Sequence, residues 1–401
     1  VATFTWLDSS EEHRRQMRDV LSQFREQGTR DELGLAGIRD AFADLMFPGT
    51  GALQTRARYF FFVPWMYQDL DRRRYPASEI ARRGRKAELD LIDALVPNDQ
   101  PGTIGKRAGR NLQRLPSSIY WSGLRRLGIL GVPDSQEQFH RRFDRLSTRA
   151  RALRNDDGDV VEPAPRAWHL GVPTAPSTFP EAASFDLEPF EAEFLLDRIR
   201  LAAPSSFFKW WLDGKLPGIE AKFPWEIEQT EALPPHLLRE LAHARNFSVG
   251  MYGATLLYTC LLTRMIPGAD ERADGLAEAF DRWFAHFRAK SDDFSSWDFL
   301  DFWRCVVDCG GRVGANTRDF TEGWVRLARS AASAAALRES AQARQLLEHR
   351  EWVLKKGLAR FRNPRALELW GGASGLRQID YRWSSAVVIG RDIATALGWL
   401  R

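Results

Sequence analysis

The chain contains few cysteines, only Cys260, Cys305 and Cys309 among its 401 residues. Three thiols cannot form a disulfide framework, and no CxxC or Cys/His set offers the four ligands of a structural zinc ion. Cys305 and Cys309 are one turn apart on a predicted helix, and such thiols are usually buried core side chains. The low cysteine content therefore fits a protein of the reducing cytoplasm.

Long apolar segments are also missing. The first ten residues, VATFTWLDSS, lack the basic and apolar regions of a signal peptide. Residues 246–263 are uncharged, but this run of 18 residues contains Asn246 and several hydroxyl side chains. Because a membrane-spanning helix needs about 20 predominantly apolar residues, we expect a buried core helix here and no membrane partner.

Sequence signatures of hydrolysis and nucleotide binding are missing as well. The seven histidines form no HExxH or HxK motif, and no GxSxG offers a nucleophile. Residues 101–110, PGTIGKRAGR, resemble a phosphate loop. However, only two residues separate Gly102 from Gly105, and Arg107 replaces the required Ser or Thr. We therefore expect no nucleotide site and no cofactor.

The chain does have ample material for a folded core. Hydrophobic residues make up 44% of it and aromatic residues 12%, which excludes a mainly disordered chain. Since domains usually contain roughly 100 to 200 residues, the length predicts two domains. Six prolines and a DDGD turn between Asn155 and Pro189 indicate a connecting segment. We place the N-terminal domain at 1–155, the connecting segment at 156–189 and an all-α C-terminal domain at 190–401.

The spacing of apolar residues predicts a mainly α-helical, multi-helical fold. A capping box at Ser9 precedes apolar residues at helical spacing, and the same spacing recurs from Ile38 to Met46. The run YFFFVPWM from Tyr59 fits either a buried strand or a kinked helix. In the C-terminal half, helices are predicted for 191–201, 235–244, 247–265, 274–288, 297–308, 320–336 and 340–359.

Charge is unevenly distributed, although the formal net charge is only +4. Residues 72–155 contain 19 Lys and Arg against 8 Asp and Glu, a net charge of +11. Residues 350–401 contain 10 against 4, a net charge of +6, so the rest of the chain carries −13. Such segregation is typical of proteins that bind nucleic acid or an acidic partner.

The strongest local signal is the basic segment 106–154. Ser117 and Ser118 can cap a helix through Leu127, and a Gly-containing turn at 128–133 precedes a second helix at 135–146. This pattern predicts a helix-turn-helix or winged-helix element that sets arginine against phosphate, while a solvated Arg-rich face fits the charges equally. The residues predicted to contact nucleic acid are Arg110, Arg114, Arg125, Arg126, Arg141, Arg142 and Arg145, with Arg382 and Trp383 as a smaller C-terminal patch.

One group of acidic residues suggests a metal-dependent nuclease instead. Asp40 and Asp44 share a helix face, and with Asp31 or Glu32 they could hold a divalent cation. The acids are matched by an equal number of nearby arginines, so we favour a structural ion-pair network. The arginines of that predicted network are Arg30, Arg39, Arg56 and Arg58.

A second acidic group resembles the acid, acid-x-Lys core of a restriction-nuclease superfamily. It consists of Asp213, Glu220 and Lys222. In that chemistry the carboxylates bind a metal ion and the lysine orients the attacking water. The core requires a β-hairpin, whereas prolines flank this segment, so we predict that Ala221 lies outside any hairpin.

Several longer motifs resemble one known family. They are TRDELG from Thr29, IRDAFADLMFPGT from Ile38, QTRARYFFFVPW from Gln54, SSIYWSGLRRLGIL from Ser117, and ARFRNPRALELWGGASG with IDYRW between Ala359 and Trp383. Over essentially its whole length the chain resembles a bacterial family of similar size described only as a domain of unknown function. The resemblance implies no catalytic residue. It implies a place in anti-phage defence loci, beside a DEAD/DEAH-type helicase and a phospholipase-D-like nuclease.

These observations predict a non-catalytic subunit of a defence complex that binds nucleic acid, with DNA as the expected form, or that assembles its partners. The alternatives are a metal-dependent nuclease and a protein scaffold that binds an acidic protein and no nucleic acid.

Overall fold

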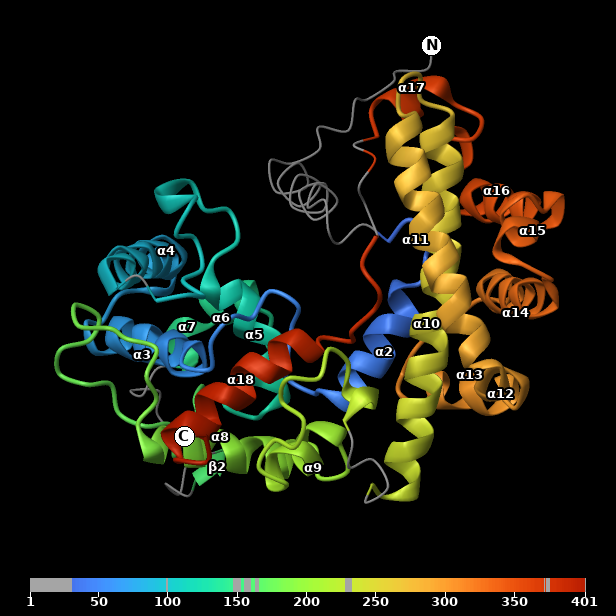
Figure 1. The fold of residues 1–401 in the computed structure, drawn as a ribbon. Helices are drawn as coiled ribbons and strands as arrows, with labels where there is room; N and C mark the ends of the chain where they lie inside the picture. The colour runs from blue at the N-terminus through green and yellow to red at the C-terminus, as the bar shows by residue number, and fades with distance from the viewer. Residues whose placement is uncertain are drawn as a thin grey trace, which may run out of the picture. The chain divides into compact units, whose positions relative to one another are not determined.

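The computed structural model describes residues 31–98, 100–146, 153–154, 160–162, 166–227, 233–370, 372 and 376–400. In these residues the chain is mainly α-helical (Figure 1), which confirms the fold class predicted from the sequence. The helix predicted after Ser9 lies outside them.

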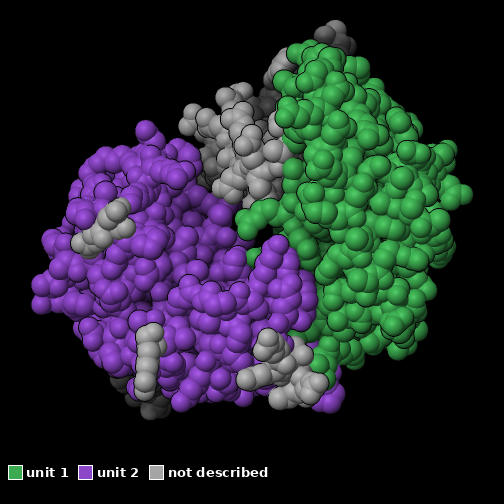
Figure 2. All heavy atoms as spheres, viewed as in Figure 1, with its two compact units in different colours: residues 1–42, 238–380 green, residues 43–237, 381–401 purple. Residues whose placement is uncertain are grey.

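Contacts between residues divide the chain into two compact units (Figure 2). Unit 1 comprises residues 1–42 and 238–380, and unit 2 comprises residues 43–237 and 381–401. Each unit is therefore built from two separate stretches of the chain. The boundaries predicted near residues 155 and 189 differ from these, and the predicted division into independently folded domains stays a prediction.

Unit 2 contains helices of very different lengths and a small antiparallel sheet. The sheet pairs Leu153 with Glu162 and Arg154 with Val160. The elements are α3 (Tyr59–Arg72), α4 (Ala77–Leu95), η1 (Val96–Asn98), η2 (Gly109–Asn111), α5 (Pro116–Arg126), α6 (Gln136–Arg141), α7 (Phe143–Leu146), β1 (Leu153–Arg154), β2 (Val160–Glu162), α8 (Pro189–Ala202), α9 (Phe207–Asp213), η3 (Pro224–Glu226) and α18 (Trp383–Ala396).

Helix α3 forms the core of unit 2. The apolar run from Tyr59, which the sequence left open between strand and helix, is helical and contains Pro64. Its residues from Tyr59 to Tyr67 are all buried, and a helix that is apolar on every side needs neighbours around it. Helices α4 and α5 supply two of them. The segment 166–188, part of the predicted connecting segment, supplies a third, since the indole N–H of Trp65 donates to the carbonyl of Pro173 at 2.6 Å.

Unit 1 is built around the long helix α10. Its elements are α10 (Pro235–Arg264), α11 (Asp270–Ala289), α12 (Ser291–Ser295), α13 (Phe299–Asp308), α14 (Ala315–Ser330), α15 (Ala334–Arg338), α16 (Ala341–Lys355), η5 (Lys356–Leu358) and α17 (Pro364–Glu368). The first residues of α10 belong to unit 2, and α2 (Ala36–Met46) likewise begins in unit 1 and ends in unit 2.

The uncharged run 246–263 forms the C-terminal part of α10 and is a core segment, as predicted. Its glycines allow close packing, because a Cβ at Gly253 would lie only 2.1 Å from the ring of Trp283 on α11. The indole N–H groups of Trp283 and Trp324 donate to the carbonyls of Val249 and Gly250, at 2.7 and 2.9 Å. Among the helices described, none has the length and apolar character needed to cross a membrane.

Several predicted helix ends differ from the structure. The helices predicted at 235–244 and 247–265 are one continuous helix, since no glycine or proline interrupts the chain between them. Conversely, the helix predicted at 320–336 ends at Ser330, and a new one begins where the Ser333 hydroxyl accepts a hydrogen bond from the N–H of Ala336. The helix predicted at 135–146 is divided at Arg142 into α6 and α7.

Candidate nucleic-acid interface

Helix α5 has one buried face and one arginine-bearing end. Tyr120, Trp121 and Leu124 are buried in unit 2, at the spacing of one helix face. Arg125 and Arg126 in the last turn are exposed and form no ion pair with any residue that the structure describes. Their guanidinium groups are therefore available to a ligand.

Three more of the predicted arginines lie on α6, on α7 and at the residue between them, and each makes different contacts. Arg141 forms an exposed ion pair with Glu137 one turn earlier. Arg142 donates to both carboxylate oxygens of the buried Asp134, at 2.7 and 2.9 Å. Arg145 is exposed and, within the described ranges, makes no ion pair. Because an exposed i,i+4 pair contributes only about 0.3–0.5 kcal/mol, Arg141 can exchange Glu137 for a phosphate, whereas Arg142 is bound to the core.

Arg110 and Arg114 lie in the loop that precedes α5. The guanidinium of Arg110 contacts the carboxylate of Asp93 at 2.9 Å, and both side chains are more than half exposed. Arg114 is half-buried and has no ion-pair partner in the described part of the chain. A phosphate contact of either residue stays a prediction.

The predicted C-terminal patch is not a surface. Arg382 contacts the Asp44 carboxylate and donates to the carbonyl of Thr50 at 3.0 Å. Trp383 is only 2% exposed, and its indole N–H donates to the carbonyl of Ala221 at 2.8 Å. A buried ring cannot stack on a base, so we exclude Arg382 and Trp383 from the candidate interface. The apolar spacing of Trp383, Ala386 and Ile389 along α18 is the sequence signal of this core position.

A buried polar network connects the helices under these arginines. The Glu88 carboxylate of α4 accepts hydrogen bonds from the N–H and the hydroxyl of Ser117 on α5, both at 2.7 Å. Gln136 of α6 donates to the Ser117 hydroxyl at 2.7 Å and to the Tyr67 hydroxyl at 3.0 Å. The Tyr67 hydroxyl also lies 2.7 Å from Nε2 of His140. The network therefore joins α3, α4, α5 and α6.

No cation pairs with the Glu88 carboxylate in this network. Glu88 is 2% exposed, and this burial raises its pKa to about 7. Burial likewise lowers the pKa of His140 to about 4. Sequence reasoning missed Glu88, yet it stands at helical spacing with Ile80, Gly84 and Leu91 on the buried stripe of α4.

The network predicts a measurable pH effect. The pKa of Glu88 in the folded protein, about 7, exceeds its ordinary value of 4.5. Its contribution to the free energy of unfolding is therefore complete below pH 4.5 and is lost as the pH rises through about 7. The loss amounts to about 3 kcal/mol in all. His140 acts in the opposite sense, because its lowered pKa makes stability rise with pH between about 4 and 6.5.

The substitution Glu88→Gln should therefore remove the effect of this one carboxyl group on the pH dependence of stability. Relative to the parent, this variant should gain stability as the pH rises from about 5 to about 8, because Gln cannot lose a proton. Urea unfolding at several pH values measures the difference. Parallel stability curves for parent and variant would contradict the account.

The first acidic group is distributed over separate structural contacts. The Asp31 carboxylate accepts hydrogen bonds from the N–H groups of Leu35 and Ala36 at the start of α2. Asp40 pairs with Arg39 at 3.0 Å. The preferred prediction of a structural ion-pair network is therefore correct for the type of contact, but most of the acids and arginines have partners other than the predicted ones. The other partners are Asp392 for Arg56, Glu191 for Arg58, Arg382 for Asp44, and Lys355 and Arg360 for Glu32; Arg30 lies outside the described residues.

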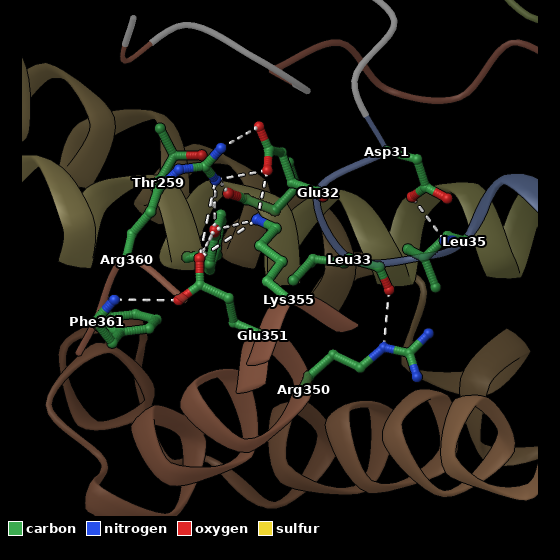
Figure 3. A network of polar contacts seen from close by, with 12 residues as sticks. Asp31, Glu32, Leu33, Leu35, Thr259, Arg350, Glu351, Lys355, Arg360 and Phe361 are labelled. Atoms are coloured by element: carbon green, nitrogen blue, oxygen red, sulfur yellow. Dashed lines mark hydrogen bonds and ion pairs between the residues drawn. The ribbon is translucent and has the colours of Figure 1, made fainter. Parts of the chain in front are cut away.

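Glu32 takes part in a buried ion network within unit 1 (Figure 3). Its carboxylate lies 2.6 Å from both the Lys355 ammonium and the Arg360 guanidinium. The Tyr258 hydroxyl donates to Glu351 and accepts from both cations at 2.9 Å. Burial alone would raise the pKa of Glu32, but the hydrogen bond from Arg360 and the charge of Lys355 lower it to about 2.

The backbone that follows Glu32 is held by a second buried arginine. Arg350 donates to the carbonyl of Leu33 at 2.8 Å (Figure 3) and to the carbonyl of Gly34 at 3.1 Å. Gly34 has a positive φ of 65°, and a Cβ there would lie 2.7 Å from Leu354. Within unit 1, Arg350 therefore holds residues 33–34 of the TRDELG motif, while Glu32 of that motif contacts Arg360 of the ARFRNP motif.

The second acidic group does not share one site. Asp213 pairs with Arg200 and Lys209, both at 2.8 Å, and Glu220 pairs with Arg391 at 2.8 Å. Ala221 lies in the loop between α9 and η3, which confirms its predicted position outside a hairpin. In the part of the chain described, no group of three or more His, Cys, Asp or Glu residues is placed to hold a metal ion.

Comparison with known proteins gives one match. No curated protein and no solved structure matches the chain. The model of a family of unknown function, DUF6361, matches residues 1–396. Since this match covers nearly the whole sequence, the chain belongs to the DUF6361 family of unknown function.

Proposed function

We propose that the chain is a non-catalytic subunit that binds nucleic acid, with DNA as the expected form, through its phosphate backbone. The observation that carries the proposal is the state of Arg125, Arg126 and Arg145, which are exposed and form no ion pair with the described residues. Arg141 and Arg110 add two exposed cations, which pair with the exposed carboxylates of Glu137 and Asp93. Arginine binds phosphate with planar, often bidentate hydrogen bonds, and each contact releases counterions from the nucleic acid.

The order of elements supports a helix-turn-helix or winged-helix element as the carrier of these arginines. Helix α5, the turn at 128–133 and α6 follow one another, and the β1–β2 ribbon follows α7 in the place of a wing. The rings of Trp121 and Phe139, 5.1 Å apart, bring α5 and α6 into contact. Because α6 has only six residues, it offers little length for reading bases, and we expect binding without sequence preference.

The contacts of the acidic residues also fit a binding role better than they fit the metal site of a nuclease. The carboxylates that suggested metal chemistry are engaged by basic side chains or by backbone N–H groups, as described above. We therefore place ATP hydrolysis and strand cleavage in partner proteins, a helicase and a phospholipase-D-like nuclease of the same anti-phage defence locus. The family resemblance supports these partners.

The proposal is tested with the purified protein and two labelled duplexes of unrelated sequence in the presence of Mg²⁺. We expect equal affinity for both duplexes by fluorescence anisotropy, with both strands intact on a denaturing gel. Metal-dependent cleavage would favour the nuclease. Absence of binding would favour a scaffold for an acidic protein, and purification of the tagged chain from its native locus would then identify that protein.

A further inference from the structure

Helix α8 of unit 2 is apolar on two opposite faces, and within the described residues only one of them is covered. On the inner face, Ala192, Leu195 and Ile199 are buried, and α18 and α9 contact the helix (Figure 1). The outer face carries Phe190, which is 55% exposed, and Leu201, which is 70% exposed. A helix that is apolar on every side is normally buried on every side, so the outer face of α8 has the character of a contact surface.

The apolar residues of the outer face are aligned along the helix. Phe190, Phe194 and Leu201 follow one another at intervals of four and seven residues, which is the spacing of a single helix face. At a rise of 1.5 Å per residue they extend over about 16 Å. Phe194 is half-buried, and its ring lies 5.9 Å from that of Phe61 on α3. The middle of this face is therefore fixed to the core of unit 2.

A tight turn adds Leu170 to the same surface. The ring of His169 lies 5.6 Å from that of Phe194, and a Cβ at Gly171 would lie 3.3 Å from the Phe194 ring. The N–H of Val172 donates to the carbonyl of His169 at 3.1 Å and closes the turn. Leu170, between these two neighbours of Phe194, is 77% exposed.

We call Phe190, Phe194, Leu201 and Leu170 the α8 patch. Single exposed apolar side chains are ordinary on a protein surface, whereas contiguous ones mark interaction sites. The α8 patch is contiguous, because three of its residues share one helix face and the fourth lies beside Phe194.

The edge of the α8 patch is acidic. Residues 181–201 contain six Asp and Glu against two Arg, a net charge of −4. On α8 itself, Glu193 is exposed and forms no ion pair with the residues that the structure describes. The Asp197 side chain is 67% exposed and lies 3.5 Å from Arg200. An apolar surface with carboxylates along it is complementary to an apolar segment that carries Lys or Arg.

The same charges argue against two other occupants. Nucleic acid would bring its phosphates against the carboxylates of Glu193 and Asp197. A second copy of this chain, bound by a two-fold symmetric contact, would place the same carboxylates of both copies against each other. A straight row of apolar side chains about three turns long instead suits a helix, whose own apolar residues recur every three to four positions.

We propose that the α8 patch is the docking site for an amphipathic helix of a partner protein, with apolar residues on one face and Lys or Arg beside them. The apolar residues cover Phe190, Leu201 and Leu170, and the basic side chains pair with Glu193 and Asp197. This inference does not rest on nucleic-acid binding. It assigns protein assembly to residues other than the arginines of α5 to α7.

The test uses the full-length protein and two fluorescently labelled synthetic helical peptides. Both have Leu at helical spacing, with Lys at the remaining positions in one peptide and Glu in the other. Fluorescence anisotropy should show saturable binding of the Leu/Lys peptide and at least about tenfold weaker binding of the Leu/Glu peptide. Replacing Phe190 and Leu201 together by Ser should lower affinity for the Leu/Lys peptide at least about tenfold, the loss typical of a central interface residue.

A matched control replaces two exposed leucines of unit 1. Leu358 and Leu369 are 70% and 78% exposed, and changing both to Ser removes a similar apolar area elsewhere on the chain. This variant should bind the Leu/Lys peptide within about threefold of the parent. Both double variants should unfold at the temperature of the parent, because the substituted side chains are exposed.

Each outcome decides the inference. If the Leu/Lys peptide shows no saturable binding, or binds the two double variants equally, the α8 patch is not a docking site for such a helix. If the Leu/Glu peptide binds as tightly as the Leu/Lys peptide, the acidic edge does not select the partner and the proposed chemistry is wrong. If sedimentation velocity shows the parent as a dimer and the Phe190→Ser, Leu201→Ser variant as a monomer, the occupant is a second copy of this chain and the proposal is wrong.

Discussion

Replacing Arg125, Arg126, Arg141 and Arg145 together by Glu should lower duplex affinity on the order of a thousandfold. Each arginine that contacts a phosphate contributes at least about 1 kcal/mol, so the loss of four contacts amounts to about 4 kcal/mol. Arg142 is left in place because it pairs with the buried Asp134. A glutamate there would face that carboxylate and confuse loss of binding with loss of stability.

A control variant in unit 1 distinguishes the effect of the α5–α7 surface on binding from the effect of the net charge of the chain. Arg282, Arg304, Arg326 and Arg344 are exposed on four different helices. Changing these four residues to Glu alters the net charge of the chain by the same amount. We expect this control to bind duplex within about threefold of the parent. Equal losses in the two variants would mean that overall charge, and not the α5–α7 surface, determines binding.

The second large effect concerns stability and the ion network of Figure 3. Among the described residues, Glu32→Gln leaves the buried Lys355 and Arg360 with a single carboxylate, that of Glu351. Removing one partner of a buried ion pair costs about 3–5 kcal/mol, which corresponds to a Tm lower by roughly 10 °C for a unit of this size. Thermal unfolding followed by circular dichroism measures the change.

Glu348→Gln on α16 is the control for that substitution. Glu348 pairs with Arg344 one turn away, and the Arg344 side chain is half exposed. An exposed pair of this kind contributes about 0.3–0.5 kcal/mol, so the Tm should hardly change. If Glu32→Gln and Glu348→Gln unfold at the same temperature, the buried network does not stabilise unit 1.

The same network sets the expected response to acid. The pKa of Glu32 in the folded protein, about 2, lies below its ordinary value of 4.5. Its contribution to the free energy of unfolding is therefore complete above pH 4.5 and is lost as the pH falls toward about 2. The difference in unfolding free energy between parent and Glu32→Gln should shrink over that range.

Features that depend on local pattern were predictable from the sequence. The helical spacing around Tyr120 and Trp121 places the end of α5 within one residue of its prediction, and Ser135 forms the capping box of α6. The predicted cap of α5 is wrong, since the helix starts at Pro116 and Ser117 and Ser118 lie inside it. The exposed arginines at the end of α5 follow from the same periodicity. A single sequence also suffices to find the core character of residues 246–263, because polar hydroxyls and glycines interrupt the run.

Partners far apart in the chain were not predictable. Glu32 and Arg360 are separated by 328 positions, and Arg56 and Asp392 by 336. Local spacing carries no information about such pairs, so the sequence assigned the acids to arginines close by. The same limit explains Trp383, whose aromatic and basic neighbourhood resembles a stacking surface until the chain folds and buries the ring.

The salt dependence of duplex binding tests the central claim most directly. The logarithm of affinity should fall linearly with the logarithm of salt concentration, and phosphate contacts from Arg125, Arg126, Arg141 and Arg145 should contribute about −3.6 to the slope. The variant with these four residues changed to Glu should lose that contribution and keep only the smaller slope of the remaining contacts, such as that of Arg110. A parent slope near zero, or one that the four substitutions leave unchanged, would contradict binding of the phosphate backbone by this surface.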